Sequence, residues 1–446
     1  MIQLFPYQQE GAVWLTQSKF RLLADEMRLG KTPQTIRASD IVQAKRILVL
    51  CPAVARINWL REFDKFALND RSGAVIDSKD VVNRITSSDI VACSYDLLTD
   101  DAILAALLAV TWDVLVLDEC HYLKSIDAVR SASVLGKDGL IHKAARTWFL
   151  SGTPAPNHPA ELWTMLYVAG VTTLTYDAFV KRYCTGRNTP YGFKITGGKN
   201  IPELRDAMAP FMLRRTKAEV KPEMPPVLYS TLVVQPGEVD IESHFFAQWT
   251  AGGDAAVLKT IEAQAGNAQN AWTSGQFLAL EAIADQTALY RRYTGLQKVP
   301  AVVEKVAAEL KAGAYNKIVL FAWHQAVIET LRQGLREFGA VTLYGGTPPA
   351  KRQANIDEFQ NHPRCCVFIG NILAAGTAID LSAASNCLIV EPSWVPGENA
   401  QASMRMDGPA QKEQISVQFV SVAGAFDESM QTTLSRKMQT IANLFD

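Results

Sequence analysis

Two short segments of the chain hold the residue types that bind and hydrolyse nucleoside triphosphates. The first ends in Gly30, Lys31 and Thr32, and the second is Asp118 followed by Glu119. In a phosphate-binding loop the backbone N–H groups surround the phosphates, the lysine reaches them and the threonine hydroxyl contacts Mg²⁺. An Asp that holds Mg²⁺ and a Glu that orients water complete such a site. We therefore predict Lys31, Asp118 and Glu119 as catalytic residues, with Thr32 and Asp118 as Mg²⁺ ligands.

The phosphate loop departs from its consensus, which has glycine five residues before Gly30, where this chain has Asp25. Gly-Lys-Thr alone is also compatible with a solvated turn. The loop and the Asp-Glu pair gain meaning because they occur together, in this order and after apolar runs typical of strands. Gly30 allows close approach to phosphate, and the helix N-terminus that follows favours anions. Met27 and Leu29 of the same loop are predicted to contact the nucleotide.

The elements that must position these residues alternate between strand and helix patterns in both halves of the chain. The interval near residues 236–296 is rich in Ala, Gln and Glu and favours helices. We therefore predict two α/β lobes with parallel sheets and a helical element between them. The predicted strands are Ile47–Cys51, Ile90–Cys93, Val114–Leu117 and Thr147–Leu150, then Lys317–Phe321, Val341–Tyr344, Cys366–Ile369, Cys387–Glu391 and Val417–Val420.

Length and composition describe a globular protein of more than one domain. The chain has 446 residues, 48% hydrophobic and 20% charged, which is too long for one ordinary core. No apolar run reaches the ~18 residues of a membrane helix, and no secretory signal is recognised. The seven cysteines are scattered, so we expect reduced thiols, a cytoplasmic location and neither disulfides nor zinc. The net charge of −1 neither supports nor excludes binding to nucleic acid.

Further segments, taken in order, resemble the Swi/Snf-type DNA translocases of helicase superfamily II. The resembling segments are Phe5–Leu15 (the adenine-contacting glutamine motif), Leu50–Ala53 with Asn58–Phe63 (motif Ia), Cys93–Leu98 (the Ser-Tyr-Asp segment), Asp118–His121 (motif II), Leu150–Pro154 with Asn157 (motif III) and Phe211–Lys217 (the element that closes the first lobe). Within this family, Phe179–Cys184, Gly198–Asn200 and Phe321–Gln325 are similar to the annealing-helicase, fork-remodelling branch. The resemblance runs from residue 5 to about residue 430.

The resemblance implies two RecA-like lobes, with ATP and Mg²⁺ as cofactors. We expect an ATP-binding first lobe at residues 1–225, a linker and helical insertion at 226–298, and a second lobe at 299–446. The resemblance also assigns roles in the nucleotide site. Gln8 would read adenine, Asp380 would face the nucleotide, Arg405 would act on the phosphates, and His121, Ser151, Gly152 and Thr153 would couple hydrolysis to movement.

Contacts to DNA would follow the phosphates and carry no sequence information. The candidates implied by the resemblance are Ala53, Arg56, Trp323, His324, Gly345 and Thr377. Trp323 is equally compatible with a core position. The basic, glycine-interrupted stretch that contains Arg182, Arg187, Lys194 and Lys199 is compatible with a DNA contact or with a solvated loop.

Two positions depart from the family pattern. Arg28 stands in the phosphate loop where the family usually has glycine. In the segment that resembles motif VI, Gln401–Gln411, Arg405 matches the first of two family arginines and Gly408 replaces the second. Because an arginine finger supplies ~10³–10⁵ in rate, the second departure affects the expected turnover.

The sequence thus predicts a DNA-dependent ATPase, a helicase-like motor that moves along or remodels duplex or branched DNA without sequence preference. We expect no membrane partner and a monomer. The alternative, favoured by Gly408, is a degenerate ATP-gated DNA-binding clamp with slow turnover. The compact chain suggests a bacterial or viral origin.

Overall fold

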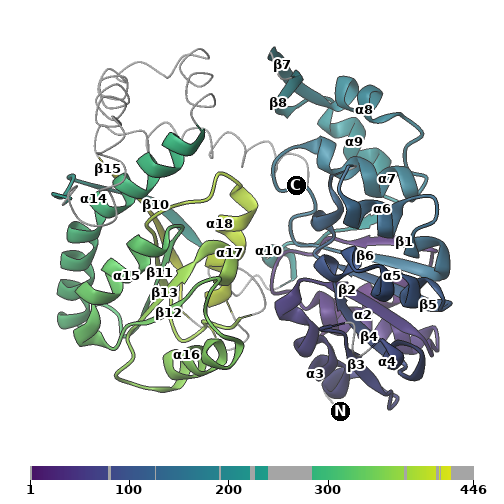
Figure 1. The fold of residues 1–446 in the computed structure, drawn as a ribbon, viewed down its shortest axis with the longest axis horizontal. Helices are drawn as coiled ribbons and strands as arrows, with labels where there is room; N and C mark the ends of the chain where they lie inside the picture. Colours follow the sequence, from purple (N-terminus) through teal and green to yellow (C-terminus); the bar gives the residue numbers. More distant parts are fainter. Residues whose placement is uncertain are drawn as a thin grey trace. The chain divides into compact units, whose positions relative to one another are not determined.

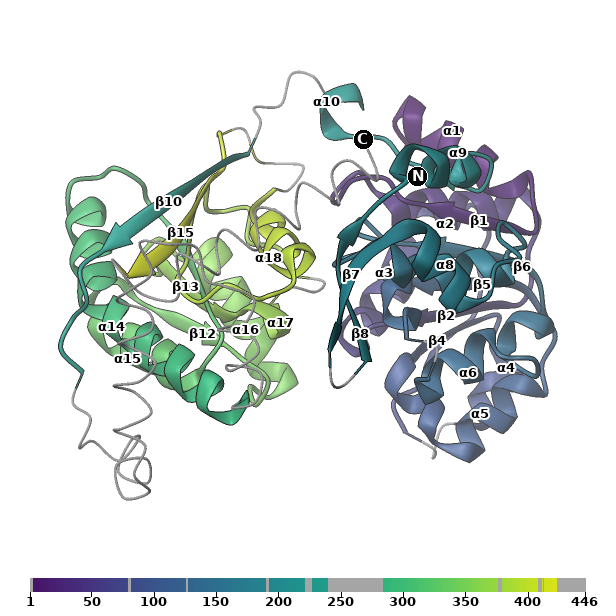
Figure 2. The same cartoon turned by 90° about the horizontal axis from the view of Figure 1, so that it is seen from above.

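The computed structural model describes residues 3–78, 82–125, 127–189, 192–220, 227–239, 284–375, 379–407, 411 and 413–422. The chain divides into two compact units that separate after residue 223, here called lobe 1 and lobe 2 (Figures 1 and 2). Each lobe is built on one sheet in which every described strand pair is parallel. The prediction of two α/β lobes with parallel sheets is confirmed.

The sheet of lobe 1 has the strand order β3-β4-β2-β5-β6-β1-β9. Its strands are β1 (Phe20–Leu23), β2 (Ile47–Cys51), β3 (Gly73–Val75), β4 (Ile90–Ser94), β5 (Trp112–Asp118), β6 (Ala144–Leu150) and β9 (Met212–Leu213). The central strands β2 and β4 are buried along their whole length. Helices cover both faces of such a sheet, so its central strands read as continuous apolar runs, which is why β2, β4, β5 and β6 were recognised in the sequence. Strands β1, β3 and β9 were not predicted.

Helices and short 3₁₀ turns connect these strands. The helices are α1 (Pro6–Thr16), α2 (Lys31–Ile41), α3 (Arg56–Phe66), α4 (Asn83–Ser87), α5 (Asp101–Leu108), α6 (Val129–Leu135), α7 (Trp163–Val168), α8 (Tyr176–Tyr183), α9 (Ile201–Met208) and α10 (Lys217–Val220). The 3₁₀ turns are η1 (Ala53–Ala55), η3 (Tyr95–Thr99), η4 (Cys120–Leu123), η5 (Leu140–Lys143) and η6 (Pro159–Leu162).

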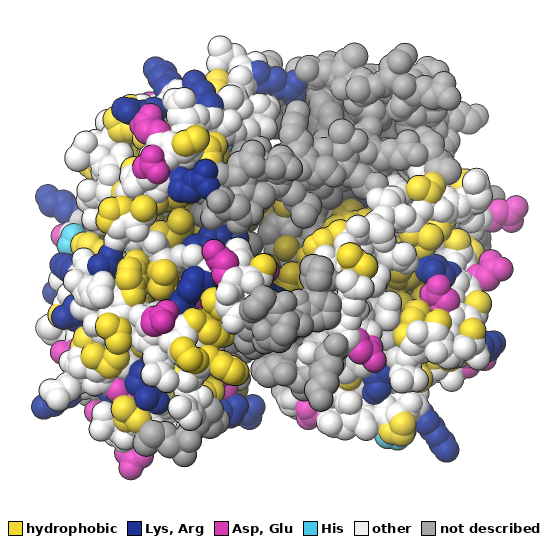
Figure 3. Space-filling model, turned by 180° about the vertical axis from the view of Figure 1, so that it is seen from behind, with side chains coloured by type: hydrophobic (Ala, Val, Ile, Leu, Met, Phe, Trp, Pro, Cys, Tyr) yellow, Lys and Arg dark blue, Asp and Glu magenta, His cyan; other side chains and the backbone are white. Residues whose placement is uncertain are grey.

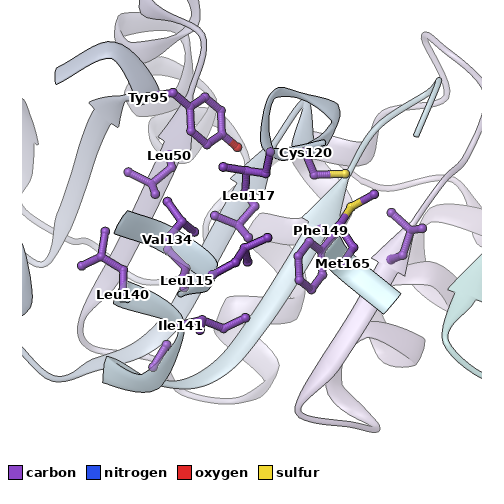
Figure 4. Packing of buried hydrophobic residues seen from close by; sticks show 14 of the residues in the cluster. Leu50, Tyr95, Leu115, Leu117, Cys120, Val134, Leu140, Ile141, Phe149 and Met165 are labelled. Carbon is purple, nitrogen blue, oxygen red and sulfur yellow. The ribbon is translucent and has the colours of Figure 1, made fainter. Parts of the chain in front are cut away.

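Alternation along the strands divides the core of lobe 1 into two clusters, one on each face of the sheet. Leu115 and Leu117 of β5 belong to one cluster, whereas Val114 and Val116 belong to the other. Successive side chains of a strand point to opposite faces, so one apolar run fills both clusters. Figure 4 shows the first cluster, in which Tyr95 lies beside Leu50 and Leu117.

Lobe 2 has the strand order β10-β15-β14-β11-β13-β12. Its strands are β10 (Leu228–Val234), β11 (Ile318–Ala322), β12 (Val341–Leu343), β13 (Val367–Asn371), β14 (Asn386–Ile389) and β15 (Ser416–Val422). Its helices are α14 (Ala284–Lys311), α15 (Gln325–Gly334), α16 (Pro349–Asn361), α17 (Ile372–Ala375) and α18 (Pro396–Ser403), with 3₁₀ turns η7 (Arg336–Phe338) and η8 (Met404–Met406).

Helix α14 continues through residue 298, the predicted end of the insertion. Its residues Val299, Val302 and Val306 belong to the core of lobe 2. Residues 240–283, which hold most of the predicted helical insertion, lie outside the described residues. The three predicted domain boundaries therefore stay a prediction. None of the described helices is long and apolar enough to cross a membrane.

A two-stranded antiparallel hairpin between α8 and α9 belongs to neither large sheet. It consists of β7 (Cys184–Thr189) and β8 (Gly192–Gly198) and occupies the basic stretch for which the sequence left a DNA contact or a solvated loop open. Figures 1 and 2 show it at the border of lobe 1, next to α8 and α9.

Candidate functional site

The predicted nucleotide residues of lobe 1 follow three neighbouring strands at one edge of the sheet. Leu23 at the end of β1 is paired with Leu150 at the end of β6, and Leu150 is paired with Asp118 at the end of β5. The three segments that continue from this row are the phosphate loop, motif II and motif III. Carboxyl ends of parallel strands are the usual location of ligand sites in open α/β sheets. The structure thus brings together the lobe 1 residues predicted to act on ATP.

The phosphate loop ends where α2 begins at Lys31. Gly30 has a left-handed backbone with φ 75°, and a Cβ at this position would lie 2.3 Å from Nε2 of Gln8. The left-handed backbone favours glycine at residue 30, and a side chain there would also have to displace the Gln8 amide. The Lys31 ammonium donates to the carbonyl oxygens of Asp25 at 2.8 Å and Glu26 at 3.3 Å, so the loop folds around its own lysine.

The backbone conformation at Arg28 shows why the family usually has glycine at this position. Its backbone is left-handed, with φ 69°. The left-handed region costs a residue with a side chain about 1–2 kcal/mol, whereas glycine adopts it freely. The usual glycine therefore fits the conformation of this loop, and the chain accommodates an arginine at some cost in stability.

At this edge of the sheet the buried Lys31 ammonium interacts with several carboxylates. Burial lowers the pKa of Lys31, and the carboxylates of Glu119, Asp25 and Asp118 act in the opposite direction. Burial raises the pKa of Asp118 to about 6, with Glu119 as the second cause and the Lys31 charge opposing both. Lys31 and Asp118 thus influence each other's protonation, as expected for residues that share one site.

Two aromatic residues that the sequence analysis did not assign to the site hold Asp118. The Trp59 indole donates to Asp118 Oδ2 at 2.8 Å, and the Tyr95 hydroxyl donates to the Asp118 carbonyl oxygen at 2.8 Å. The N–H of Glu119 donates to Asp118 Oδ1 at 3.1 Å. These bonds fix both the strand end and the carboxylate. Trp59 lies in the segment that resembles motif Ia, and Tyr95 lies in the Ser-Tyr-Asp segment. The resemblance of these two segments to the family is therefore the sequence feature that could have identified both residues.

Glu119 occupies a strained position. Its backbone is left-handed, with φ 49° and ψ 53°, and such strain in a residue with a side chain is concentrated at functional sites. Its Oε2 accepts from Ser151 Oγ at 3.3 Å and lies 3.3 Å from Nδ1 of His121. His121 Nδ1 is also 3.2 Å from Ser151 Oγ, which in turn accepts from the Thr153 N–H at 3.1 Å. Motif II and motif III are therefore joined at the glutamate.

Gly152 completes this junction. A Cβ there would lie 2.6 Å from Cγ of Met27 and 3.4 Å from Nζ of Lys31. Motif III thus packs directly against the phosphate loop, and any side chain at residue 152 would displace Met27. The coupling role predicted for His121, Ser151, Gly152 and Thr153 stays a prediction, although all four lie at this junction.

Gln8 contacts the phosphate loop, and the Leu29 side chain of that loop is buried. Gln8 donates from Nε2 to the Leu29 carbonyl oxygen at 3.2 Å and accepts the Phe5 N–H at 3.1 Å. The Leu29 side chain is buried, with 1% exposed. The predicted contacts of Gln8, Met27 and Leu29 with nucleotide stay predictions.

Asp25, the residue in place of the consensus glycine, anchors the loop to the end of lobe 1. Its fully buried carboxylate accepts from Arg215 Nε at 3.0 Å and Nη2 at 2.6 Å, and from Gln34 Nε2 at 3.0 Å. Arg215 also donates to Gln34 Oε1 at 2.8 Å. A two-pronged arginine–carboxylate pair is geometrically demanding, so it fixes the loop in place. The sequence analysis assigned Arg215 only to the closing element of the lobe.

We predict that Arg215→Ala lowers the free energy of unfolding by about 3 kcal/mol or more, because it leaves the buried Asp25 charge uncompensated. Urea denaturation of the whole chain measures the change. Lys65→Ala, which removes the more exposed ion pair of Lys65 with Glu62 at 2.9 Å, is the matched control and should cost less than about 1 kcal/mol. Equal losses in the two variants would contradict an anchoring role for Arg215.

The residues at this edge fit ATP with Mg²⁺ by their donor chemistry. Among the described residues, no group of three or more His, Cys, Asp or Glu side chains could hold a metal ion by itself. Mg²⁺ does not need such a cage, because it is commonly bound by one or two carboxylates together with phosphate oxygens and waters. Asp118, with the hydroxyl of Thr32 in the first turn of α2, is a donor set of this kind. Lys31 and the start of α2 supply the positive side of the site.

In lobe 2 one hydrogen bond joins the two segments predicted to contact nucleotide. The Leu381 N–H donates to the Arg405 carbonyl oxygen at 2.9 Å, so Asp380 and Arg405 belong to one substructure. Asp380 Oδ1 accepts the N–H of Ser382 at 3.2 Å. Arg405 lies in η8, directly after α18. Gly408 lies outside the described residues.

The predicted DNA contacts are distributed over both lobes, and each stays a prediction. Arg56 donates to the carbonyl oxygens of Ala53 at 2.9 Å and Ile76 at 2.5 Å, so it also fixes η1. Gly345 accepts from Arg352 Nη2 at 2.9 Å, and a Cβ at residue 345 would meet open space. Thr377 lies outside the described residues.

Trp323 and His324 are held by a buried carboxylate that the sequence analysis missed. Glu391 accepts from the backbone N–H groups of both residues at 2.9 Å, and its Oε1 lies 2.7 Å from Nδ1 of His324. The guanidinium of Arg291 lies 5.3 Å from the centre of the Trp323 ring. Trp323 is half-buried, so the structure places it at the border of the lobe 2 core.

The sequence was compared with families of known proteins. It matches the model of the SNF2-related domain over residues 7–281, which is more than half of the chain, and that of the helicase conserved C-terminal domain over residues 301–407. The chain belongs to the SNF2-related family. The predicted identity as a Swi/Snf-type protein of helicase superfamily II is confirmed.

Curated relatives within the SNF2 group align along nearly the whole chain. The DNA annealing helicase and endonuclease ZRANB3 of Mus musculus is 28% identical over 98% of this chain and 40% of its own length. The SWI/SNF-related matrix-associated actin-dependent regulator of chromatin subfamily A-like protein 1 of Xenopus laevis is 28% identical over 98% of this chain and 44% of its own length. This chain therefore spans about two fifths of these relatives. The predicted likeness to the annealing-helicase branch is confirmed by the first of them.

A solved structure, the Sulfolobus solfataricus SWI2/SNF2 ATPase core in complex with dsDNA, is 22% identical with a TM-score of 0.45, over 100% of this chain and 97% of that one.

Proposed function

We propose that this chain is a DNA-dependent ATPase that uses ATP hydrolysis to move along or remodel duplex or branched DNA without sequence preference. The observation that carries the proposal is the row formed by Leu23, Leu150 and Asp118, because it places three loop segments of the nucleotide motifs at one edge. Membership of the SNF2-related family supports the same function. The curated relative named as a DNA annealing helicase supports branched DNA as a substrate.

In this proposal each residue at the edge has a separate task. Lys31 and the N–H groups at the start of α2 would bind the phosphates, and Thr32 with Asp118 would hold Mg²⁺. Glu119 orients the attacking water and receives its proton. Mg²⁺ would neutralise charge that develops on the phosphates during transfer. Ser151 and His121 contact Glu119 and would transmit the state of the site to motif III.

We predict that duplex DNA stimulates ATP hydrolysis and that its affinity falls steeply as salt is added, because the proposed contacts are to phosphates. Steady-state ATPase assays with duplexes of unrelated sequence at two salt concentrations measure both effects. Lys31→Ala is the control for contaminating ATPase activity. Strong preference for one sequence, or no stimulation at either salt concentration, would count against a motor.

The alternative is an ATP-gated DNA clamp with slow turnover, and the observation that favours it is Gly408 in place of an arginine. The same assay separates the two functions, since a clamp binds DNA more tightly with ATP but turns over slowly with or without DNA. We also propose that the chain acts as a monomer in a reducing, cytoplasmic environment. The seven cysteines are all free, which supports the second part of this proposal.

A further inference from the structure

The β7–β8 hairpin is anchored firmly at its base. The Lys199 N–H donates to the Tyr183 carbonyl oxygen at 2.8 Å, which closes the chain at the foot of the hairpin. Cys184 is buried in a small cluster of lobe 1, and Ile195 packs against that cluster. A two-stranded hairpin alone is marginally stable in water, so these contacts hold it to the lobe.

Phe193 continues the apolar face of β8 beyond the part that packs on the lobe. It lies two residues before Ile195, so the two side chains lie on the same face of the strand. Ile195 is half-buried, whereas Phe193 is 50% exposed. Its partner in the register is Asn188, which offers no apolar surface. The hairpin thus presents an aromatic ring to solvent on a fixed support.

The chain segment that contains this ring carries an excess of positive charge. The segment 178–202 contains five Lys or Arg residues and no Asp or Glu, in a chain whose net charge is −1. Lys181 and Lys199 are exposed at the base of the hairpin. The neighbouring carboxylate, Glu203, lies 2.7 Å from the guanidinium of Arg182 and so offsets that one charge. In Figure 3, which shows the molecule from behind, Lys and Arg side chains gather at this end of lobe 1.

We propose that the β7–β8 hairpin binds single-stranded DNA, with Phe193 stacking on a base and Lys181 and Lys199 contacting phosphates. Cations and an exposed aromatic ring together are the requirement for binding single strands, since every unpaired base offers a flat face. The bases of a duplex are already stacked on each other, so a duplex would engage the cations but not the ring. The inference rests on the proposed function for its DNA substrate, and it adds a contact for the single strands at a branch point.

The test compares binding of single-stranded and duplex DNA by the whole chain without nucleotide. Fluorescence anisotropy with labelled oligonucleotides of about 20 residues or base pairs gives both affinities. Phe193→Ala should weaken single-strand binding about 5- to 20-fold and leave duplex binding within about twofold, because stacking is lost. Phe193→Trp should retain the parent affinity, whereas Phe193→Leu, which keeps apolar surface, should behave like Phe193→Ala.

The cations are tested by the salt dependence. Lys181→Ala with Lys199→Ala should make the logarithmic salt slope for single strands shallower by about 1.4, since each phosphate contact contributes about 0.7. Lys137→Ala with Lys143→Ala, which removes two exposed lysines of lobe 1 outside the hairpin, should leave the slope unchanged.

Two outcomes would overturn the proposal. One is unchanged single-strand binding in Phe193→Ala, and the other is an equal loss for duplex and single strand, which would make the hairpin a duplex contact. The ATPase assay separates this failure from failure of the proposed function. If the parent binds single strands through the hairpin but shows no DNA-stimulated hydrolysis, the motor is wrong and the hairpin site stands.

Discussion

Glu119→Gln is expected to reduce ATP turnover by about 10²–10⁴-fold while ATP and Mg²⁺ still bind, because it removes a general base and little else. Glutamine has nearly the same shape as glutamate, so the left-handed backbone at residue 119 and the contact to Ser151 can persist. The amide cannot accept a proton from water. Hydrolysis should therefore be lost at the chemical step.

Binding of Mg²⁺ should survive the same substitution for an electrostatic reason. The negative charge of Glu119 is the second cause, after burial, that raises the pKa of Asp118. Removing that charge lowers the pKa of Asp118, which favours the carboxylate form needed by a metal ion. The Trp59 hydrogen bond to Asp118 does not involve Glu119 and remains.

Single-turnover hydrolysis and equilibrium binding of a fluorescent ATP analogue separate the two effects. Glu62→Gln, whose parent carboxylate pairs with Lys65 within α3, is the matched control and should hydrolyse ATP at the parent rate. Retention of more than about a tenth of the parent turnover in Glu119→Gln would be incompatible with a general base at this position. Loss of nucleotide binding would instead indicate a structural role.

Most strands of the two large sheets could be predicted from the sequence because burial on both faces makes them continuous apolar runs. The predicted strand Ile47–Cys51 has the bounds of β2, and β14 begins one residue before its predicted start. Asp118 and Glu119 could be predicted for the same reason, since they directly follow such an apolar run. Strand β10 was missed because most of it is exposed and its pattern lacks an apolar run.

The partners that hold the site could not be predicted, because they are distant along the chain. Tyr95, Trp59 and Arg215 are separated by 23, 59 and 190 residues from the groups that they bind. Local patterns carry no information about such pairs. The left-handed backbones of Arg28 and Glu119 could not be predicted either. Residues with a side chain disfavour left-handed φ and ψ angles, and only the surrounding packing enforces them. These residues are the ones that shape the site.

The second large effect is expected in lobe 2, for Arg405. The backbone hydrogen bond from Leu381 to Arg405 fixes η8 beside the Asp380 segment, so the backbone of Arg405 is held in place. If Arg405 acts on charge that develops on the phosphates, it stabilises the transition state more than bound ATP. Arg405→Ala should then lower kcat by about 10³-fold or more, with a small change in nucleotide affinity.

Replacement by lysine refines this expectation. A lysine side chain keeps the charge but lacks the planar, two-pronged donor geometry of the guanidinium, so Arg405→Lys should recover only part of the rate. Arg336→Ala, which removes an exposed arginine of lobe 2 in η7, is the control and should leave kcat unchanged.

Because Gly408 occupies the position of the family's second arginine, no other arginine stands three residues after Arg405 to replace it. Loss of Arg405 should therefore be severe, and Gly408→Arg introduced into Arg405→Ala tests whether the missing arginine can restore activity. Measurement of kcat at saturating ATP and DNA decides the matter: a parent rate in Arg405→Ala would exclude Arg405 from hydrolysis and leave it a structural or DNA-contacting residue.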